Sequence, residues 1–378
     1  MGRDRSLFEQ SRLATPASCV LIVGLLTALL VIAPGCGTSN FSGGLPPVST
    51  FTTIDAPGAG TTMSLGTRAL AINGGGDIAG TFTDSNRTNH GFVRSAGGTL
   101  TVFDAPGAGT LANQGSLVSS INDGGMIVGS FADQNFVVHG FLRTQGGTFT
   151  TIDVPNSLST LLLGINAADV TTGTFIDASI ASHGFVRASD GTFTIFDAPG
   201  IGSGGQTVPG RINATGTVAG FSIDSNSVLH GLLRGPDGTL TTLDAPSAGT
   251  TAQNGTEVSG INSGGILIGS ISANGIRRSF VRATDGTYTV FDPPSTGSTG
   301  SSAFGINDSG AIVGSYKDAG SVIHGYLRQP DGSFTTIDDP QAFSSTNSGT
   351  RAEGINPSGT IVGFFDDFSQ AVHGFVRK

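Results

Sequence analysis

The stretch from Ile121 to Pro155 reads INDGGMIVGSFADQNFVVHGFLRTQGGTFTTIDVP and places a single histidine, His139, in an apolar segment. The same order of residues recurs along the chain, beginning each time with an asparagine that is followed seven residues later by a glycine. These asparagines are Asn73, Asn122, Asn166, Asn213, Asn262, Asn307 and Asn356. In every repeat but the fifth, an aspartate follows the glycine by four residues, and a histidine follows that aspartate by six. A fixed repeat of this kind indicates an array of similar structural units.

Each repeat contains four short segments rich in β-branched and aromatic residues, separated by turn sequences that contain glycine. The turns include NDSG at 307–310 and PDG at 330–332, which suit tight hairpins. The repeats lack the 3.6-residue apolar stripe of a helix, which excludes a helical solenoid. Four strands at a period of about 47 residues predict an all-β fold, a seven-bladed β-propeller with four-stranded blades.

The two ends of the repeat region predict how such a ring would close. The region begins with a segment of the fourth type, 51–55, and ends with a segment of the third type, 373–377. One incomplete blade is thus left at each end. We expect the N-terminal strand 51–55 to pair with the C-terminal strands, because this completes the last blade and leaves no exposed sheet edge. Residues 51–378 are therefore expected to form one seven-repeat domain.

The repeat also carries a family resemblance. The pattern I-N-x-x-G-x-I-V-G followed by H-G-F-[VL]-R, spread over residues 51–378, resembles the HAF-type extracellular repeat family of bacterial proteins. The His-Ala-Phe step of that family is His-Gly-Phe here, with Leu232 and Tyr326 as variants of the aromatic residue. The resemblance implies an exported repeat protein, and it implies no catalytic residues.

The N-terminus differs in composition from the repeats. Arginines precede an apolar run, 20–33, that ends at Pro34-Gly35-Cys36, and this order is typical of a signal peptide. The end resembles a bacterial lipobox with Cys36 as the lipidated residue, although Ala33 stands where an aliphatic residue such as leucine is usual. We expect 1–36 to be a signal peptide, or alternatively a membrane anchor, and 37–50 to be a flexible linker. No cysteine follows Cys36, which excludes disulfides and thiolate chemistry in the repeat domain.

The histidines have acidic partners at a constant offset. If the third and fourth strands form a hairpin around 145–147, the numbers of opposed residues sum to 292, so His139 faces Asp153. The same arithmetic predicts six pairs: His90 with Asp104, His139 with Asp153, His183 with Asp197, His230 with Asp244, Arg278 with Asp292, and His324 with Asp338. The ring closure predicts a seventh, His373 with Asp55. With the loop aspartates such as Asp133, each blade could hold a carboxylate–imidazole–carboxylate cluster. An acid–base dyad or a metal site would use these groups. A group repeated in every blade favours a structural brace that satisfies buried polar atoms, with no metal.

A ligand site is expected where the repeats differ. The residue five positions before each repeat asparagine should line the central channel, and it is charged in only three repeats, as Arg68, Glu257 and Arg351. The ring closure would bring Arg68 beside Arg351, with Arg211 and Glu353 nearby. We expect these five residues to form an anion-binding site at the channel mouth, or else to be solvated residues at its rim.

Composition and motifs narrow the function. The net charge is −9, and the only lysines are Lys317 and Lys378, which excludes nucleic acid and allows membrane contact only through an N-terminal lipid or anchor. The sequence favours an exported, surface-anchored monomer, periplasmic, on the outer membrane or extracellular. It would act without a cofactor as a binding or scaffold module for an extracellular ligand, an acidic glycan or a protein. The alternatives are a propeller lyase or hydrolase with its site at the channel mouth, and a purely structural envelope protein.

Overall fold

The computed structural model describes residues 50–297 and 300–378, and all regular elements in these ranges are β-strands. The described residues include no helix long and apolar enough to cross a membrane. The expected signal peptide 1–36 with Cys36, and nearly all of the expected linker 37–50, lie outside the described residues.

The 28 described strands form groups of four that pair in the order first, second, third, fourth. The first strands are β2 (Gly66–Ile72), β6 (Gly115–Ile121), β10 (Ser159–Ile165), β14 (Gln206–Ile212), β18 (Gly255–Ile261), β22 (Ser301–Ile306) and β26 (Thr350–Ile355). The second strands are β3 (Ile78–Thr83), β7 (Ile127–Ala132), β11 (Thr171–Ile176), β15 (Val218–Ile223), β19 (Leu267–Ala273), β23 (Ile312–Lys317) and β27 (Ile361–Asp366).

The third and fourth strands complete each group. The third strands are β4 (Asn89–Arg94), β8 (Val138–Arg143), β12 (Ser182–Arg187), β16 (Leu229–Arg234), β20 (Ile276–Arg282), β24 (Ile323–Arg328) and β28 (Val372–Arg377). The fourth strands are β5 (Leu100–Phe103), β9 (Phe149–Ile152), β13 (Phe193–Phe196), β17 (Leu240–Leu243), β21 (Tyr288–Phe291), β25 (Phe334–Ile337) and, from the start of the chain, β1 (Phe51–Ile54). All pairs within a group are antiparallel.

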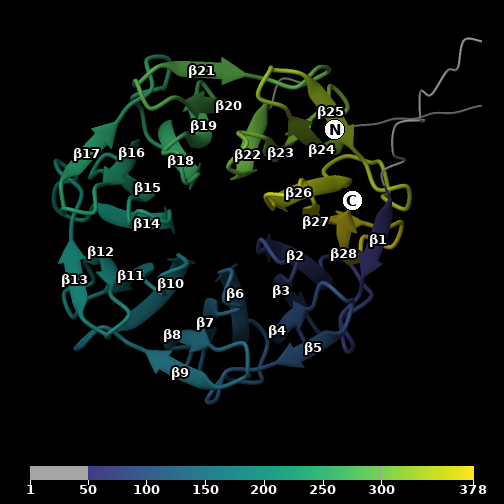
Figure 1. Cartoon of the computed structure of the whole chain (residues 1–378), viewed down its shortest axis with the longest axis horizontal. Coiled ribbons are helices and arrows are strands. Elements are labelled where there is room, and N and C mark those ends of the chain that lie inside the picture. Colours follow the sequence, from purple (N-terminus) through teal and green to yellow (C-terminus); the bar gives the residue numbers. More distant parts are fainter. Residues whose placement is uncertain (1–49, 298–299) are drawn as a thin grey trace, which may run out of the picture. The chain divides into compact units, whose positions relative to one another are not determined.

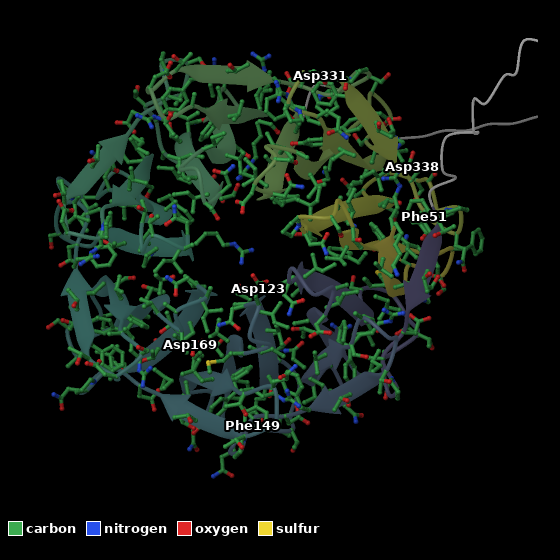
Figure 2. All side chains as sticks on the ribbon, in the orientation of Figure 1. Phe51, Asp123, Phe149, Asp169, Asp331 and Asp338 are labelled. Carbon is green, nitrogen blue, oxygen red and sulfur yellow. The ribbon has the colours of Figure 1, made fainter. Side chains whose placement is uncertain are left out.

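The groups stand side by side around a common centre, with the first strands innermost and the fourth strands outermost (Figure 1). Figure 2 accordingly shows Phe51 and Phe149 at the periphery and Asp123 near the centre. Several neighbouring groups touch through a single parallel residue pair, such as Asn89 with Gly115. The first described strand meets the last, because β1 pairs with β28 over four residues, from Phe51 with Arg377 to Ile54 with Gly374. The structure thus shows the expected pairing of the N-terminal strand for residues 51–54.

The glycine seven residues after each repeat asparagine lies in close contact with a backbone carbonyl of the first strand. A Cβ placed on Gly129 would lie 2.0 Å from the Leu117 carbonyl oxygen and 2.8 Å from the ring of Phe141. The corresponding carbonyl is 2.0 to 2.1 Å away in all repeats. Phe141 is 1% exposed and belongs to a cluster of buried hydrophobic residues. The glycine is thus required by the packing of the second strand between the first and the third.

The repeat asparagines are buried and link each group to the next. Each Nδ2 donates to the backbone carbonyl of the asparagine that follows in the chain, over 3.0 to 3.3 Å, and Asn356 donates to Asn73. Each Oδ1 accepts the backbone N–H four residues later, over 2.8 to 3.1 Å. The asparagine bonds form a circle that returns to its starting residue. This role explains why asparagine recurs without exception, since a short amide both donates and accepts.

Candidate functional site

The histidines take part in the pairs that the hairpin register predicts. The observed register of β8 with β9 pairs Gly140 with Ile152, whose numbers sum to 292. Each histidine Nδ1 lies 2.8 to 3.0 Å from the nearest carboxylate oxygen of its partner in the expected set. In the fifth repeat, Arg278 Nε donates to Asp292 over 2.6 Å. Five of the six histidines pack on an aromatic ring, as His139 does on Phe131 with ring centroids 5.0 Å apart, whereas His230 lies opposite Ser222.

The environment of these pairs differs from the expectation in two ways. The partner aspartates are 42% to 55% exposed in the six histidine pairs, so the expectation of a brace that satisfies buried carboxylates is wrong. The loop aspartates lie 3.3 to 3.9 Å from Nε2, and only His373 with Asp367 is within hydrogen-bond distance. Their main contacts are to the backbone, since Asp133 Oδ1 accepts the N–H groups of Asn135 and Val137 over 2.8 Å. The loop aspartates therefore shape turns.

Two of the histidines have a raised pKa. Partial burial lowers the pKa of His183, but the hydrogen bond and charge of Asp197, with the help of Asp177, outweigh the burial and raise it. His373 is raised in the same way by Asp55 and Asp367. The pKa of Asp177 is lowered, chiefly by the backbone N–H of Ala181.

These shifts predict how stability depends on pH. Because the two histidine pKa values are raised on folding, their contribution is complete below about pH 6.5, the unfolded value, and is lost as pH rises through the folded pKa. The contribution of Asp177 is present above its unfolded pKa and is lost as pH falls through its folded pKa. We expect wild type to lose more unfolding free energy between about pH 6 and pH 8.5 than a His183→Arg/His373→Arg variant, which copies the fifth repeat. Urea unfolding of both proteins at both pH values measures this difference, and equal losses would contradict it.

The structure brings Arg68 and Arg351 together, as the sequence predicts, and adds residues that the sequence reasoning missed. The guanidinium carbons lie 5.5 and 5.2 Å from the centre of one ring, that of Phe364. Arg351 forms an ion pair with Asp366 at 3.0 Å, whereas Arg68 has no carboxylate within 4.0 Å among the described residues and donates to the Ser64 carbonyl. These residues line one hollow together with Asn347 and Gln370. Burial lowers the pKa of Arg68, with Asp366 opposing that shift, and its ordinary value is high enough that it stays charged.

The hollow continues into a second one that shares Arg351 and Asn347. Its lining includes Arg277 and Lys317, and Lys317 Nζ donates to Asn347 Oδ1 over 2.8 Å. Glu257 lines neither hollow, but it forms an ion pair with Arg277, which does. We call the two hollows the mouth groove, defined by Arg68, Arg277, Lys317, Asn347, Arg351, Phe364 and Asp366.

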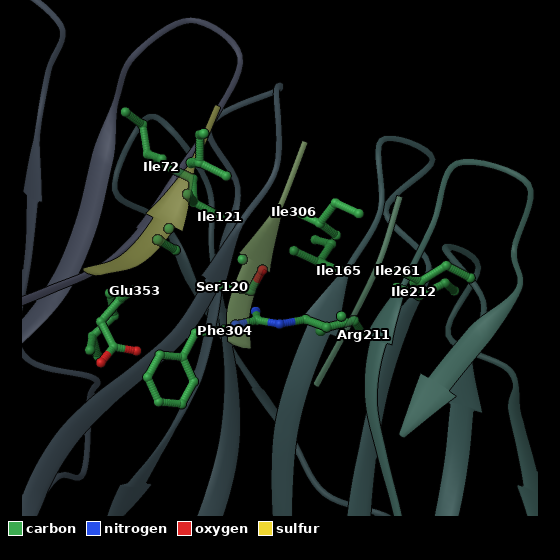
Figure 3. A pocket seen from close by; sticks show the side chains of 17 residues that line it. Ile72, Ser120, Ile121, Ile165, Arg211, Ile212, Ile261, Phe304, Ile306 and Glu353 are labelled. Atoms are coloured by element: carbon green, nitrogen blue, oxygen red, sulfur yellow. The ribbon is translucent and has the colours of Figure 1, made fainter. Parts of the chain in front are cut away.

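Arg211 and Glu353 line a different hollow from Arg68 and Arg351, although Glu353 is close enough for the charges of Arg351 and Arg68 to act on it. They line a central cavity of about 160 Å³, which we call the waist cavity, formed by residues of all the first strands. Figure 3 shows Arg211 extended toward Ser120 and Phe304, with Glu353 on the other side of Phe304. Arg211 Nη1 donates to the Ser119 carbonyl over 3.3 Å.

A signal for the missed residues is present in the sequence. The position of Phe364, eight residues after the repeat asparagine, holds serine or threonine in five repeats and phenylalanine in two. The position of Asp366, two residues later, is charged only in the last two repeats, as Lys317 and Asp366. A comparison of the second strands would therefore have identified Lys317, Phe364 and Asp366, which line the same hollows as Arg351.

Comparisons with known proteins establish the fold and no more. No protein-family model and no curated protein matches the chain. The structure is similar to a virginiamycin B lyase from Staphylococcus aureus, with a TM-score of 0.57, 14% identity and coverage of 87% of this chain and 99% of that one. It is also similar to the β-propeller domain of the Trilobed protease from Pyrococcus furiosus, with a TM-score of 0.53 and 10% identity. That match covers 82% of this chain and 96% of the other. An acylaminoacyl peptidase from Pyrococcus horikoshii matches with a TM-score of 0.51 and 10% identity, over 82% of this chain and 52% of that one. The described chain is thus an all-β protein with a β-propeller fold.

Proposed function

We propose that residues 51–378 form a seven-bladed propeller closed between its first and last repeats. Two independent contacts support the closure: β1 completes the group of β28, and Asn356 donates to the carbonyl of Asn73. The resemblance to HAF-type repeats supports an exported protein, tethered through Cys36 or an uncleaved N-terminal anchor. This N-terminal part of the proposal rests on the sequence alone.

We propose further that the mouth groove binds an acidic ligand, and that this binding is the function of the domain. The observation that carries the proposal is the pair of guanidinium groups, Arg68 and Arg351, held against one aromatic ring with a single carboxylate to pair them. The charge of Arg351 acts unfavourably on Arg68, so a bound anion would stabilise the arrangement.

The charge along the groove points to a ligand with more than one anionic group. The groove has four cations, Arg68, Arg277, Lys317 and Arg351. Only two carboxylates pair with them, Glu257 with Arg277 and Asp366 with Arg351. This excess of positive charge occurs in a protein of net charge −9. It favours electrostatic attraction of an anion to this groove over the rest of the surface.

The neutral groups of the groove suit a sugar. Phe364 offers part of an aromatic face, and Asn347 and Gln370 offer side-chain amides that can donate to or accept from hydroxyl groups. An acidic oligosaccharide combines spaced carboxylates with hydroxyl groups and apolar ring faces. We therefore propose an acidic glycan as the ligand class, recognised by a monomer without a cofactor.

The proposal predicts a specific loss of affinity in Arg68→Ala. Arg68 contributes a charge that no described carboxylate within 4.0 Å neutralises, so its removal should weaken binding of oligogalacturonate about tenfold, or about 1.4 kcal/mol. Isothermal titration calorimetry at low salt measures the change. Arg87→Ala is the charge-matched control, because Arg87 is exposed and does not line the groove.

Three results would count against the mouth groove. One is equal affinity of wild type and Arg68→Ala, and another is equal loss in Arg68→Ala and Arg87→Ala. The third is equal affinity for oligogalacturonate and a neutral oligosaccharide such as cellotetraose. Binding that weakens with added salt in wild type, and less so in Arg68→Ala, would support the proposal.

A further inference from the structure

The waist cavity is built from a position that is small in almost every repeat. Two residues before the repeat asparagine stand glycine, alanine or serine in six repeats, and Arg211 in the fourth. The close approach of neighbouring first strands explains the small residues, since a Cβ on Gly164 would lie 2.6 Å from the Gly210 carbonyl oxygen. Arg211 is therefore a departure from the repeat at a position where neighbouring first strands approach closely.

Arg211 reaches across the cavity and keeps most of its donors free. Its Nη1 donates to the Ser119 carbonyl, which belongs to another strand group 92 residues earlier in the chain. This is the only hydrogen bond of the guanidinium to a described residue, and no described carboxylate lies within 4.0 Å of it. A guanidinium has five N–H donors, so the remaining donors are available to a bound acceptor.

Glu353 lines the same cavity and is also without a hydrogen-bond partner among the described residues. It stands three positions before the repeat asparagine, where the other repeats have leucine, serine, glycine or phenylalanine. Burial raises the pKa of Glu353 to about 7, and the charges of Arg351, Arg211 and Arg68 oppose the shift. The strand beside it, β22, contributes Phe304 and Gly305 to the cavity and no titratable group.

Apart from Arg211, Glu353 and Ser120, the side chains that line the cavity are apolar. The residue directly before the repeat asparagine is isoleucine in all seven repeats, and these isoleucines line the cavity together with Phe304. A volume of about 160 Å³ has room for roughly five water molecules, or for a small organic molecule of similar size. An occupant that uses all of these groups has one polar end and a short apolar tail.

We propose that the waist cavity binds a short aliphatic carboxylic acid, with its carboxylate on Arg211, its tail on the isoleucines and Phe304, and Glu353 protonated in the complex. The carboxylate accepts from the free N–H groups of Arg211, and a protonated Glu353 can donate to it, whereas an ionised Glu353 would repel it. This site is separate from the mouth groove and does not depend on the function proposed for that groove.

Protonation of Glu353 makes the binding depend on pH in a definite direction. A short aliphatic acid is ionised from about pH 6 upward, and arginine stays charged, so only Glu353 changes in that range. Because the acid binds the protonated form, its apparent affinity should fall about tenfold between about pH 6 and pH 8. Binding at the higher pH should be accompanied by uptake of close to one proton.

Calorimetric titration of butyrate into the full-length protein, in buffers of different ionisation enthalpy, tests the site. Wild type should bind butyrate more tightly at the lower pH, and Glu353→Gln, which resembles the protonated form, should bind equally at both. Arg211→Ser, which restores a small residue typical of the other repeats, should lose at least about tenfold in affinity. Circular dichroism of each variant checks that it is folded, and Arg68→Ala should bind butyrate like wild type at the lower pH, where Glu353 is largely protonated in both proteins.

Five outcomes would overturn the proposal. Four of them are no binding of butyrate by wild type, unchanged affinity in Arg211→Ser, a pH dependence that persists in Glu353→Gln, and equal affinity for butyramide, which lacks the carboxylate. Loss of butyrate binding in Arg68→Ala with retention in Arg211→Ser would place the acid in the mouth groove, and would also overturn it. Oligogalacturonate binding is measured separately, so failure of either site leaves the other to stand or fall alone.

Discussion

Deletion of residues 51–57 is expected to unfold the domain or cause it to aggregate. The deletion removes β1, exposes the edge of β28, and removes the buried side chains of Ile54 and Ala56. It also removes the hydrogen bond that the backbone N–H of Ala56 donates to the Thr67 hydroxyl. The combined loss of buried apolar area and of strand pairing should cost on the order of 5 kcal/mol. Size-exclusion chromatography and urea unfolding measure the effect.

A point variant keeps this prediction testable if the deletion does not yield soluble protein. Ile54 is 2% exposed, so Ile54→Ala should lower the unfolding free energy by about 2 to 4 kcal/mol. Deletion of 37–48, which lies outside the described residues, is the control and should leave the unfolding midpoint unchanged. A midpoint that is insensitive to both changes in 51–57 would refute the closed propeller.

The substitution Gly129→Ala is expected to be almost as damaging, although it adds only a methyl group. The new Cβ would meet the Leu117 carbonyl oxygen and the ring of Phe141, and neither the strand nor the buried ring can move without disturbing the core. Overpacking of this kind should cost about 3 kcal/mol. Denaturant unfolding gives the value.

Gly146→Ala is the matched control for that substitution. Gly146 lies in an exposed turn of the same repeat, where a Cβ would come no closer than 3.9 Å to its nearest neighbour, the Thr144 hydroxyl. Its effect should stay within about 0.5 kcal/mol. Similar effects of the two substitutions would show that the close approach at Gly129 is not the reason for the recurrent glycine.

Much of the fold could be predicted because it depends on local spacing. The pairing of His139 with Asp153 follows from one hairpin loop, and the pairing of β1 with β28 follows from which strand type stands at each end. The role of the repeat asparagine could not be predicted in this way. Its amide bonds to a carbonyl 44 to 49 residues away in the chain, or 283 residues away for Asn356, and only the packing of neighbouring groups places these atoms together.

The candidate site was predicted in part, and the reason is a strand irregularity. The register of β26 with β27 shifts between Ala352 and Gly354, which leaves Glu353 as an unpaired bulge residue. A bulge changes the direction of the side chains that follow it, so Glu353 does not continue the face of Arg351. The sequence gives no sign of this bulge, and Arg211, which follows the same shift in β14, was misplaced for the same reason.

The circle of asparagine bonds also sets the order of events during synthesis. Each amide donates to a repeat made later by the ribosome, except that of Asn356, whose acceptor, the Asn73 carbonyl, is made first. Likewise, β1 comes first among the described strands and its partner β28 comes last. Strand β1 and the Asn73 carbonyl therefore each lack a partner until the seventh repeat has been synthesised, and these two contacts can form only then.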